Sequence, residues 1–595
     1  MRTDPDLIVG IGGGVGHDGN AAVLVGGRLI AASQEERYTR IKHDASFPEK
    51  AIRDCLSIAG LEPREVSTCA FAEKPLQFRL SDRTAHPSNL LTSSLGWLVR
   101  EGSFAYPRQA RLLFPDAKFR YAWHHASHAA AAFATSPFER AAFVCVDGKG
   151  EDINASIGIA DARRTRILYE LPYENGLGYL YSLVTYFLGF PSFGSEYKVM
   201  GLAPYGEPKW FDQLRQFVTT DEAGALEIDG PIRFYGNFSN FPEAAQLLGR
   251  RLGLPPRAKG EALTGDYIDL AASIQALFEE EILKMATFAR RMTGERNLLF
   301  AGGCAQNCVA AGLLRSSNIF ERVFNSPVAG DMGIGIGAAL LYRQAMRMPG
   351  DGKVDALGFY LGPEPGPLPR EAMQNAVAYS GSIHSAAARL IAQGNVVGWV
   401  RGRMELGARA LGARSILADP RVASMQSILN LKVKFRESFR PFAPAVLAEE
   451  APNWFDVPDA SDYMQYTAFL KPNHRCAVPE GLRGLRERLD FPRCDLPSVV
   501  HVDFSARLQT VRRDVHEDFH QLLSQFNALT GVPILINTSF NVSGQPIVRT
   551  AEEAWSCFRH TDMDFLVVGD SLIRNPNDRS PEDKRSWAQR FESFS

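Results

Sequence analysis

A scheme of strand, glycine turn and strand occurs twice in the chain and limits the folds open to it. In the first copy, the apolar stretches Leu7–Val9 and Ala21–Val25 flank a glycine-rich turn. In the second copy, Ala141–Val146 and Ala155–Ile159 flank the turn Asp147–Gly150. Short apolar or β-branched runs bounded by glycine are typical of strands, and helical sequence follows each copy. We therefore expect a duplicated α/β domain with a cleft between its halves.

A change of composition predicts a second domain. Glycine and proline are frequent from about Met348 to Pro369, which is typical of a linker. Since 595 residues exceed one ordinary domain, we expect a first domain at 1–350, a linker at 351–372 and a second domain at 373–595. The second domain is expected to open with a helix near Ala386–Ala392 and a strand at Asn395–Val400.

Overall composition argues against several classes of protein. The hydrophobic content of 45% and the charged content of 22% are ordinary for a soluble globular chain. A net charge of −2 gives no field that would attract nucleic acid or an anionic membrane. The longest apolar run, Leu177–Phe190, is too short to span a bilayer. Eight scattered cysteines and the absence of a basic, apolar leader predict free thiols in the cytoplasm.

Two histidines in an alanine-rich stretch indicate a metal site. His124 and His128 are four residues apart, so on a helix they share one face at about 6 Å, close enough to hold one ion. Asp147 and Asp331 each lie in a glycine turn and can add carboxylate oxygens. This mixture of ligands suits Fe²⁺, Mn²⁺ or Zn²⁺. The alternative is a partly buried helix whose histidines are hydrogen-bonded to neighbours.

Other parts of the first domain have less specific patterns. Glycines before His17 would let backbone approach a ligand, and His17 could act as a general base, although a flexible hairpin turn is the alternative. The charged stretch Glu35–His43, taken alone, predicts a solvated edge. The segment Leu298–Asn307 predicts a strand that runs through two glycines into a helix start, where free N–H groups favour phosphate.

Basic residues are concentrated early in the second domain. Four arginines lie within Arg401–Ser415, and lysines and arginines continue to Arg440. Guanidinium groups match phosphate bidentately, which predicts an oxyanion pocket. The alternative is a basic surface helix, against which the glycines in the run argue. Further on, Ile534–Asn541 predicts an apolar strand that delivers polar residues at its end, with a structural Asx turn as the alternative.

Ten motifs follow one another along nearly the whole chain. They are Gly16-His17-Asp18, the stretch Glu35–His43, His124-His125-x-x-His128, Val146-Asp147-Gly148-x-Gly150, Lys198-x-Met200-Gly201-Leu202-Ala203, Gly302-Gly303-x-x-x-Asn307, Asp331-x-Gly333, Gly407-x-Arg409-Ala410-Leu411-Gly412-x-Arg414, Phe439-Arg440-Pro441-Phe442 and Asn537-Thr538-Ser539-Phe540-Asn541. Together they resemble the NodU/CmcH-type O-carbamoyltransferases, which modify nodulation factors and antibiotics. The resemblance implies an α/β protein with a duplicated actin-like ATPase fold, similar to the tRNA threonylcarbamoyl transferase, followed by a YrdC-like α/β domain.

The resemblance also implies a reaction. Carbamoyl phosphate and ATP would form carbamoyl adenylate in the second domain, releasing phosphate and pyrophosphate. The first domain would then transfer the carbamoyl group to a hydroxyl of a small-molecule acceptor, such as a secondary metabolite or a glycoside, with the help of Fe²⁺ or another divalent metal. We expect no nucleic acid or membrane partner, and a homodimer is left open.

Site residues are implied by the same motifs. His17 would be the base and Lys42 a second catalytic residue, and the metal ligands would be His124, His128, Asp147 and Asp331. The adenylate would be held by Lys42, Asp147, Gly148, Lys149, Gly150, Glu151, Gly178, Gly303 and Asn307. Carbamoyl phosphate would be held by Arg409, Arg414, Lys434, Arg440, Arg507, Asn537 and Ser539.

Two other functions stay open at this point. A fused tRNA-modifying enzyme of the threonylcarbamoyl type would share both folds, but the near-neutral charge disfavours it. A non-catalytic, actin-like ATP-binding protein with a regulatory or scaffold role would lose no activity on His17→Ala.

Overall fold

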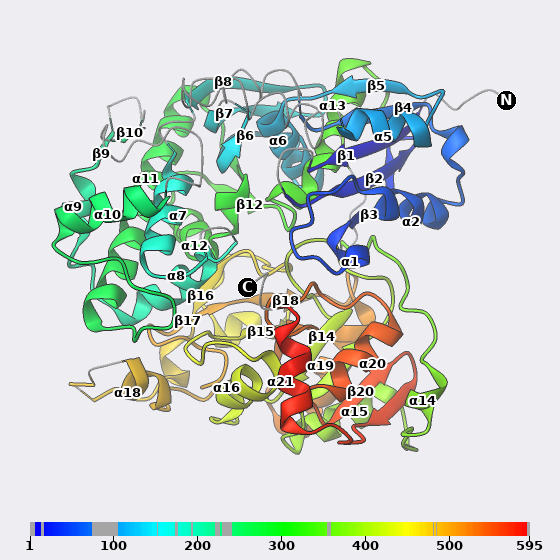
Figure 1. The fold of residues 1–595 in the computed structure, drawn as a ribbon, viewed down its shortest axis with the longest axis vertical. Coiled ribbons are helices and arrows are strands. Elements are labelled where there is room, and N and C mark those ends of the chain that lie inside the picture. The colour runs from blue at the N-terminus through cyan, green and yellow to red at the C-terminus, as the bar shows by residue number, and fades with distance from the viewer. Residues whose placement is uncertain are drawn as a thin grey trace. The chain divides into compact units, whose positions relative to one another are not determined.

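The chain forms two compact units (Figure 1). The computed structural model describes residues 6–13, 17–73, 105–151, 153–172, 176–191, 194–220, 226–228, 241–350, 352–353, 359–479, 481–482 and 485–591. The N-terminal unit consists of Met1–Thr39 and His43–Ala356, and the C-terminal unit of Arg40–Lys42 and Leu357–Ser595. The main division thus lies after Ala356, within the predicted linker 351–372. Both units are mixed α/β.

The N-terminal unit contains two five-stranded sheets of the same topology. The first has the order β3 (Arg28–Gln34), β2 (Asn20–Val25), β1 (Leu7–Gly12), β4 (Thr68–Phe71) and β5 (Lys118–Tyr121). The second has the order β8 (Thr165–Pro172), β7 (Ile153–Asp161), β6 (Arg140–Gly150), β11 (Asn297–Ala301) and β12 (Arg322–Asn325). In each sheet the first three strands are antiparallel, and the last two run parallel to the central one. The predicted duplication is confirmed.

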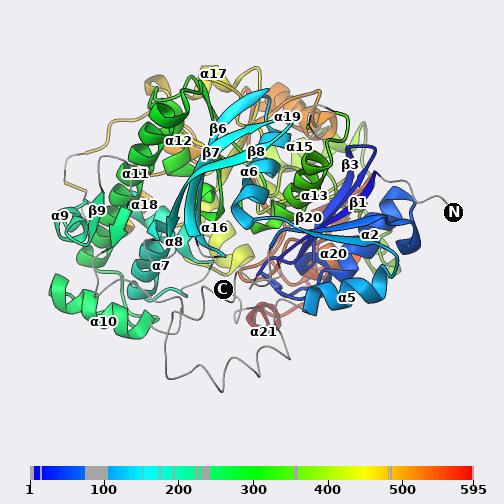
Figure 2. The same cartoon turned by 90° about the horizontal axis from the view of Figure 1, so that it is seen from above.

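Two helices pack against each other between these sheets (Figures 1 and 2). Helix α6 (His124–Thr135) contacts β6 and β11, and α13 (Ile334–Ala345) contacts β1, β2 and β4. Their backbones approach closely, because a Cβ atom added at Gly337 would lie 1.8 Å from the carbonyl oxygen of Ser127. Each helix follows the fifth strand of one sheet, so the duplication gives the two helices equivalent positions.

The other elements of this unit are helices and one further pair of strands. The helices are α1 (Glu36–Thr39), α2 (Glu49–Ala59), α5 (Ala105–Leu113), α7 (Leu177–Phe187), α8 (Glu196–Leu202), α9 (Phe211–Arg215), α10 (Phe241–Leu252), α11 (Gly265–Thr293) and α12 (Cys308–Ser316). The long helix α11 packs against α7, α8, α9 and α12. Strand β9 (Val218–Thr220) pairs antiparallel with β10 (Leu226–Ile228).

The C-terminal unit is built on a seven-stranded sheet. Its order is β18 (Gln509–Val511), β15 (Ala443–Leu447), β19 (Ile534–Ser539), β14 (Arg414–Ala418), β13 (Val397–Val400), β20 (Phe565–Val568) and β21 (Ser571–Arg574), and β16 (Thr467–Phe469) pairs separately with β17 (Ser505–Arg507). The helices are α14 (Arg370–Met373), α15 (Ile383–Ala392), α16 (Met425–Ile428), α17 (Ala451–Trp454), α18 (Leu485–Asp490), α19 (Glu517–Thr530), α20 (Ala551–Arg559) and α21 (Pro581–Gln589). The predicted helix and strand at the start of this unit are confirmed by α15 and β13.

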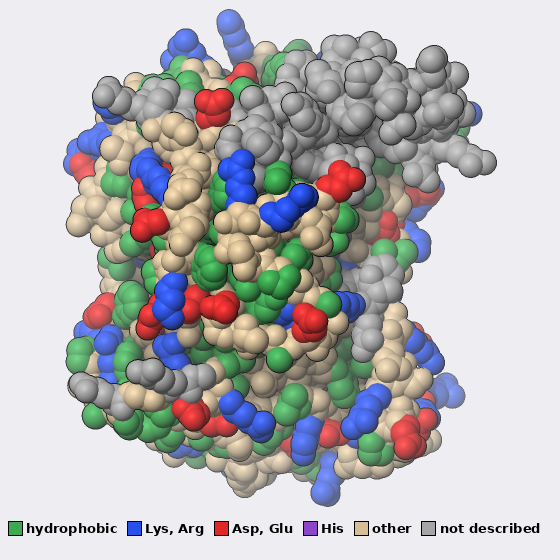
Figure 3. All heavy atoms as spheres, turned by 60° about the vertical axis from the view of Figure 1, so that its left-hand side comes forward, with side chains coloured by type: hydrophobic (Ala, Val, Ile, Leu, Met, Phe, Trp, Pro, Cys, Tyr) green, Lys and Arg blue, Asp and Glu red, His purple; other side chains and the backbone are tan. Residues whose placement is uncertain are grey.

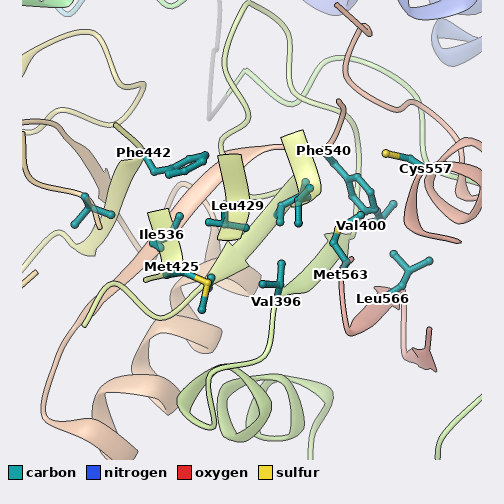
Figure 4. Packing of buried hydrophobic residues seen from close by; sticks show 14 of the residues in the cluster. Val396, Val400, Met425, Leu429, Phe442, Ile536, Phe540, Cys557, Met563 and Leu566 are labelled. Carbon is teal, nitrogen blue, oxygen red and sulfur yellow. The ribbon is translucent and has the colours of Figure 1, made fainter. Parts of the chain in front are cut away.

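The central sheet of this unit has a hydrophobic core on each face. Alternate residues of a strand point to opposite faces, and in β13 Val400 joins one core whereas Val397 and Trp399 join the other. Figure 4 shows residues of the first core, among them Val400, Phe540, Leu429 and Ile536. Because both faces are buried, the strands are apolar along most of their length.

Surface and cysteine properties agree with the composition. On the face seen in Figure 3, acidic and basic side chains are interspersed, in line with the net charge of −2. All eight cysteines are free thiols, as predicted. Among the helices that the structure describes, none combines the length and the apolar character that crossing a bilayer requires.

Candidate functional site

The four predicted metal ligands come together in the N-terminal unit. One ligand atom each of His124, His128, Asp147 and Asp331 lies within 4.8 Å of the other three, and all four residues are buried. The Nε2 atom of His128 lies 2.9 Å from Oδ2 of Asp147 and 3.3 Å from Oδ1 of Asp331. Ligands placed about 2.1 Å from one ion are roughly 3.0 to 3.4 Å apart. The spacing and the mixed N and O donors therefore fit a divalent cation.

The duplicated fold explains why these residues meet. His124 and His128 occupy successive turns at the start of α6. Asp147 lies near the end of β6, and Asp331 lies in a 3-10 turn just before α13. Because α6 and α13 hold equivalent positions in the two halves and pack together, their N-terminal ends bring the histidines and Asp331 to one place.

The electrostatics of this cluster favour bound positive charge. Burial alone would raise the pKa of Asp331, but the nearby His17 and His124 outweigh it and hold the pKa well below its usual range. Burial lowers the pKa of His124, whereas Asp331 and Asp147 raise it well above its usual range. Two buried carboxylates thus require a cation, which protonated imidazoles or a metal ion can supply.

His17 lies beside this cluster. Its Nε2 is 3.5 Å from Oδ2 of Asp331, and its Nδ1 is 3.0 Å from Oδ2 of Asp18. The other carboxylate oxygen of Asp18 is 3.0 Å from Nδ1 of His43. Removal from water lowers the pKa of His17, but Asp331 and Asp18 outweigh this effect and raise the pKa to about 9. Asp18 therefore fixes the orientation of the His17 ring.

The charged stretch Glu35–His43 is not a solvated edge, and that expectation was wrong. Glu35, Glu36 and Arg37 are buried. The Glu35 carboxylate accepts hydrogen bonds from N–H groups of Lys50 and Ala51 in the first turn of α2, where the N-cap residue provides no side-chain hydrogen bond. Glu36 accepts the N–H of His43 at 3.0 Å. Local polarity could not reveal these partners, because they come from tertiary packing.

Asn20 is a site residue to which the sequence assigned no role. Its side-chain amide donates to the carbonyl oxygens of Asp18 (2.7 Å) and Asp331 (2.8 Å) and accepts the N–H of Gly335 (3.1 Å). Glycine at 335 is required by this contact, since a Cβ atom there would lie 2.7 Å from the Asn20 Oδ1 atom. Asn20 therefore ties the turn of His17 to the turn of Asp331. The sequence feature that could have identified Asn20 is its position two residues after Asp18.

Several residues predicted to hold the adenylate surround Asp147. Its Oδ1 atom accepts N–H groups of Gly148 at 2.8 Å and Gly303 at 3.2 Å. A Cβ atom at Gly178 would lie 2.9 Å from the Asp147 carbonyl oxygen, so these glycines form one close-packed cluster. Glu151 accepts the N–H of His124 at 3.3 Å.

The other residues of that set lie elsewhere or have other contacts. Asn307 caps α12 by accepting the N–H of Ala310 and also bonds to Gln275. Lys42 groups with the C-terminal unit. Gly150 lies at the end of β6, and the Lys149 side chain falls outside the described part of the structure. Nucleotide binding by these residues stays a prediction.

In the C-terminal unit the structure brings Lys434 and Ser539 together. The buried Lys434 ammonium donates to the carbonyl oxygen of Ser539, to its Oγ at 3.3 Å, and to Oδ1 of Asn541 at 2.9 Å. Burial, reinforced by Arg436 and Arg440, holds the pKa of Lys434 well below its usual range. Asn541, which the sequence motif contained without a role, is the third member of this cluster.

Arg414 and Asn537 make mainly structural contacts. The buried Arg414 guanidinium donates to carbonyl oxygens of Gly402 (2.9 Å), Arg549 (3.1 Å) and Pro363 (3.1 Å), and burial lowers its pKa to about 10. Asn537 donates to Gln509 at 2.7 Å. Residues 401–413 are all described and contain no helix, so the alternative of a basic surface helix is wrong for this part of the run, whereas Lys432 and Lys434 lie in the π-helix Leu429–Lys434.

Two of the three remaining arginines lie in loops, and the third ends a strand. Arg409 lies in the loop before β14, Arg440 lies before β15, 3.6 Å from Glu437, and Arg507 ends β17. Their phosphate-binding role, like that of Arg414 and Asn537, stays a prediction.

Comparison with known proteins gives the family. Residues 7–340 match the model of the carbamoyltransferase N-terminus, and residues 388–575 match that of the carbamoyltransferase C-terminus. Nodulation protein NolNO of Sinorhizobium fredii is 37% identical, with 95% of this chain and 80% of that protein covered. Nodulation protein NolO of Bradyrhizobium diazoefficiens is 35% identical, with 78% of this chain and 80% of that protein covered. Uncharacterized protein sll1178 of Synechocystis is 39% identical, with 97% and 98% covered. In agreement with its ordered motifs, the chain belongs to the carbamoyltransferase family.

Proposed function

We propose that this protein is an ATP-dependent O-carbamoyltransferase that works through carbamoyl adenylate and acts on a hydroxyl of a small molecule. The observation that carries the proposal is the position of His17, 3.5 Å from Asp331 in the four-residue cluster. A base next to a cation site suits the deprotonation of an alcohol. Family membership supports the group that is transferred.

The first step belongs to the C-terminal unit. Water cleaves carbamoyl phosphate to carbamate and phosphate, and a carbamate oxygen then attacks the α-phosphorus of ATP. This forms carbamoyl adenylate and releases pyrophosphate. The buried Lys434 and the half-buried Ser539 and Asn541 form a polar cluster that suits the orientation of a phosphorylated substrate, since the lysine side-chain nitrogen provides several N–H donors. Adenylation is needed because carbamate by itself is a poor electrophile.

The second step belongs to the N-terminal unit. Nε2 of His17 takes the proton of the acceptor hydroxyl, and the hydroxyl oxygen attacks the carbamoyl carbon. The bond from that carbon to the phosphate oxygen breaks, and AMP leaves with the electron pair. Asp18 accepts the Nδ1–H of His17, so the neutral ring carries its lone pair at Nε2, where the proton is taken up. A divalent ion held by His124, His128, Asp147 and Asp331 would place positive charge beside the reacting groups and offset the Asp331 charge that raises the pKa of His17.

We further propose that the N-terminal unit has an actin-like fold and the C-terminal unit a YrdC-like fold. We also propose Fe²⁺ as the metal and a cytoplasmic location. The repeated strand order of the two N-terminal sheets supports the actin-like fold. Eight free thiols suit a reducing compartment. The acceptor class is a secondary metabolite or a glycoside, and relatives named as nodulation proteins support a search among glycosides.

Product analysis tests the reaction. The protein is incubated with ATP, labelled carbamoyl phosphate and a panel of polyketide, aminoglycoside and sugar acceptors. The proposal expects AMP, pyrophosphate and phosphate, with label in one acceptor. ADP as the only nucleotide product would overturn it. Binding of tRNA at low salt would instead favour the threonylcarbamoyl alternative, which the net charge of −2 disfavours.

A further inference from the structure

We propose that Glu73 is a positioning residue for the metal ligand His124, and this inference rests on the metal site of the proposed function. Glu73 comes two residues after β4, which lies between β1 and β5 and runs parallel to both. The carboxyl end of a parallel strand is a usual place for functional side chains. The apolar run Cys69–Ala72 followed by one carboxylate is the sequence signal for this residue.

Glu73 and the ligand cluster lie on opposite sides of the His124 ring. Oε1 of Glu73 is 3.5 Å from Nδ1 of His124. The other ring nitrogen, Nε2, is 3.3 Å from Asp147 and 3.6 Å from Asp331. A neutral imidazole carries one proton, and a carboxylate at Nδ1 attracts that proton to its own side. The lone pair of Nε2 is then directed at the cation site, which is the tautomer that metal binding requires.

Burial makes this contact selective. Glu73 is 8% exposed and His124 is 3% exposed, so neither side chain can exchange its partner freely for water. Glu151 fixes the backbone of the same histidine by accepting its N–H. The second imidazole differs, because within the described part of the chain Nδ1 of His128 is buried without a hydrogen-bond partner. His124 is therefore the metal ligand whose ring is oriented by a carboxylate, whereas the ring of His128 is oriented by the packing of α6.

Titration of the metal-free protein with Co²⁺ tests the assignment. Co²⁺ bound to imidazole and carboxylate gives visible absorption bands, which report the ligand field without any turnover. Outer carboxylates of this kind change metal affinity by about 10- to 100-fold. Glu73→Ala is therefore expected to weaken Co²⁺ binding by that factor. Glu73→Gln, whose amide oxygen can still accept the Nδ1–H, should stay within a few-fold of the wild type.

A buried carboxylate of the same unit supplies the control. Glu281 bonds to Thr220, Arg215 and Lys284 and is fully buried. Glu281→Gln should leave both Co²⁺ affinity and spectrum unchanged, even where thermal unfolding of the metal-free protein shifts. A purely structural role of Glu73 would lower the unfolding temperature and leave the affinity of the folded fraction unchanged.

The outcomes separate the two proposals. Wild-type affinity and spectrum in Glu73→Ala, or equal losses in Glu73→Ala and Glu73→Gln, would overturn the positioning role. If Glu73→Ala does not fold, Glu73→Asp is compared with Glu73→Gln, and the shorter Asp is expected to bind Co²⁺ more weakly; equal affinities would overturn the inference. Failure of the wild type to bind Co²⁺ would overturn the metal site itself, and with it this inference.

Discussion

The Nε2 atoms of His124 and His128 lie 3.1 Å apart and face the same two carboxylates, those of Asp147 and Asp331. At this distance two N–H groups pointing at each other would repel, so at least one nitrogen must present a lone pair. A shared proton or a bound cation satisfies both rings. The geometry of α6 makes this pair and fixes its spacing before any ligand arrives.

Loss of one imidazole should empty the metal site. His128→Ala removes a buried ligand, and because a lost ligand matters more than a lost outer residue, we expect affinity to fall by at least about 100-fold. Metal content per chain after gel filtration measures this. His520→Ala, which changes a histidine paired with Glu449 in the C-terminal unit, is the matched control. Equal metal content in both variants would contradict the ligand assignment.

Substitution of the proposed base should separate the two half-reactions. His17→Ala is expected to lower carbamoyl transfer by about 10²- to 10⁴-fold, because the acceptor hydroxyl loses its proton acceptor. Formation of pyrophosphate from ATP and carbamoyl phosphate should continue. Asp18→Asn should also lower transfer, since it disturbs the ring orientation of His17. A His17→Ala protein with full transfer activity would favour the non-catalytic alternative or another base.

Packing of α6 against α13 should be sensitive to a single methyl group. Gly337→Ala would place Cβ 1.8 Å from the carbonyl oxygen of Ser127, so helix separation must increase at a cost of about 1–3 kcal/mol or more. Gly265→Ala, in the first turn of α11, meets nothing within 4 Å and should be neutral or slightly stabilising. Urea unfolding of the two variants compares them. Equal stability would mean that the helices can move apart freely.

The ion pairs of Asp518 predict a pH-dependent contribution to the stability of the C-terminal unit. Asp518 lies 2.8 Å from both His384 and Arg401. Burial alone would raise the pKa of Asp518, but these two partners outweigh it and lower the pKa. A lowered folded-state pKa stabilises the protein above the unfolded-state value of about 3.9, and this stabilisation disappears as pH falls through the folded-state pKa.

Asp518→Asn should therefore cost about 1–3 kcal/mol near pH 7. Its difference from the wild type should shrink as pH falls below about 4. Asp570 also pairs with Arg401, but its side chain is 83% exposed, so Asp570→Asn should change little at either pH. Urea unfolding at a series of pH values measures both variants. A constant difference for Asp518→Asn across this range would show that charge is not the cause.

Much of the local structure followed from sequence patterns. The apolar runs at β1, β2, β6 and β7 predicted strands because side chains that alternate across two buried faces must be apolar. Glycine turns between them predicted the duplication. The prediction of a solvated edge at Glu35–His43 was wrong because these side chains bond to α2 and Asp18, partners that no local pattern identifies.

Local sequence patterns were enough to predict which residues form strands, which turns carry glycine and that two histidines share a helix face, because these properties depend on neighbours in the chain. It also carried the ordered motifs of the carbamoyltransferase family. The folded structure was needed to show that Asp147 and Asp331 meet those histidines, that His17 lies beside Asp331, and that Arg414 is bonded to backbone carbonyls. The reason is that hydrogen bonds and ion pairs between distant segments depend on how whole helices and sheets pack.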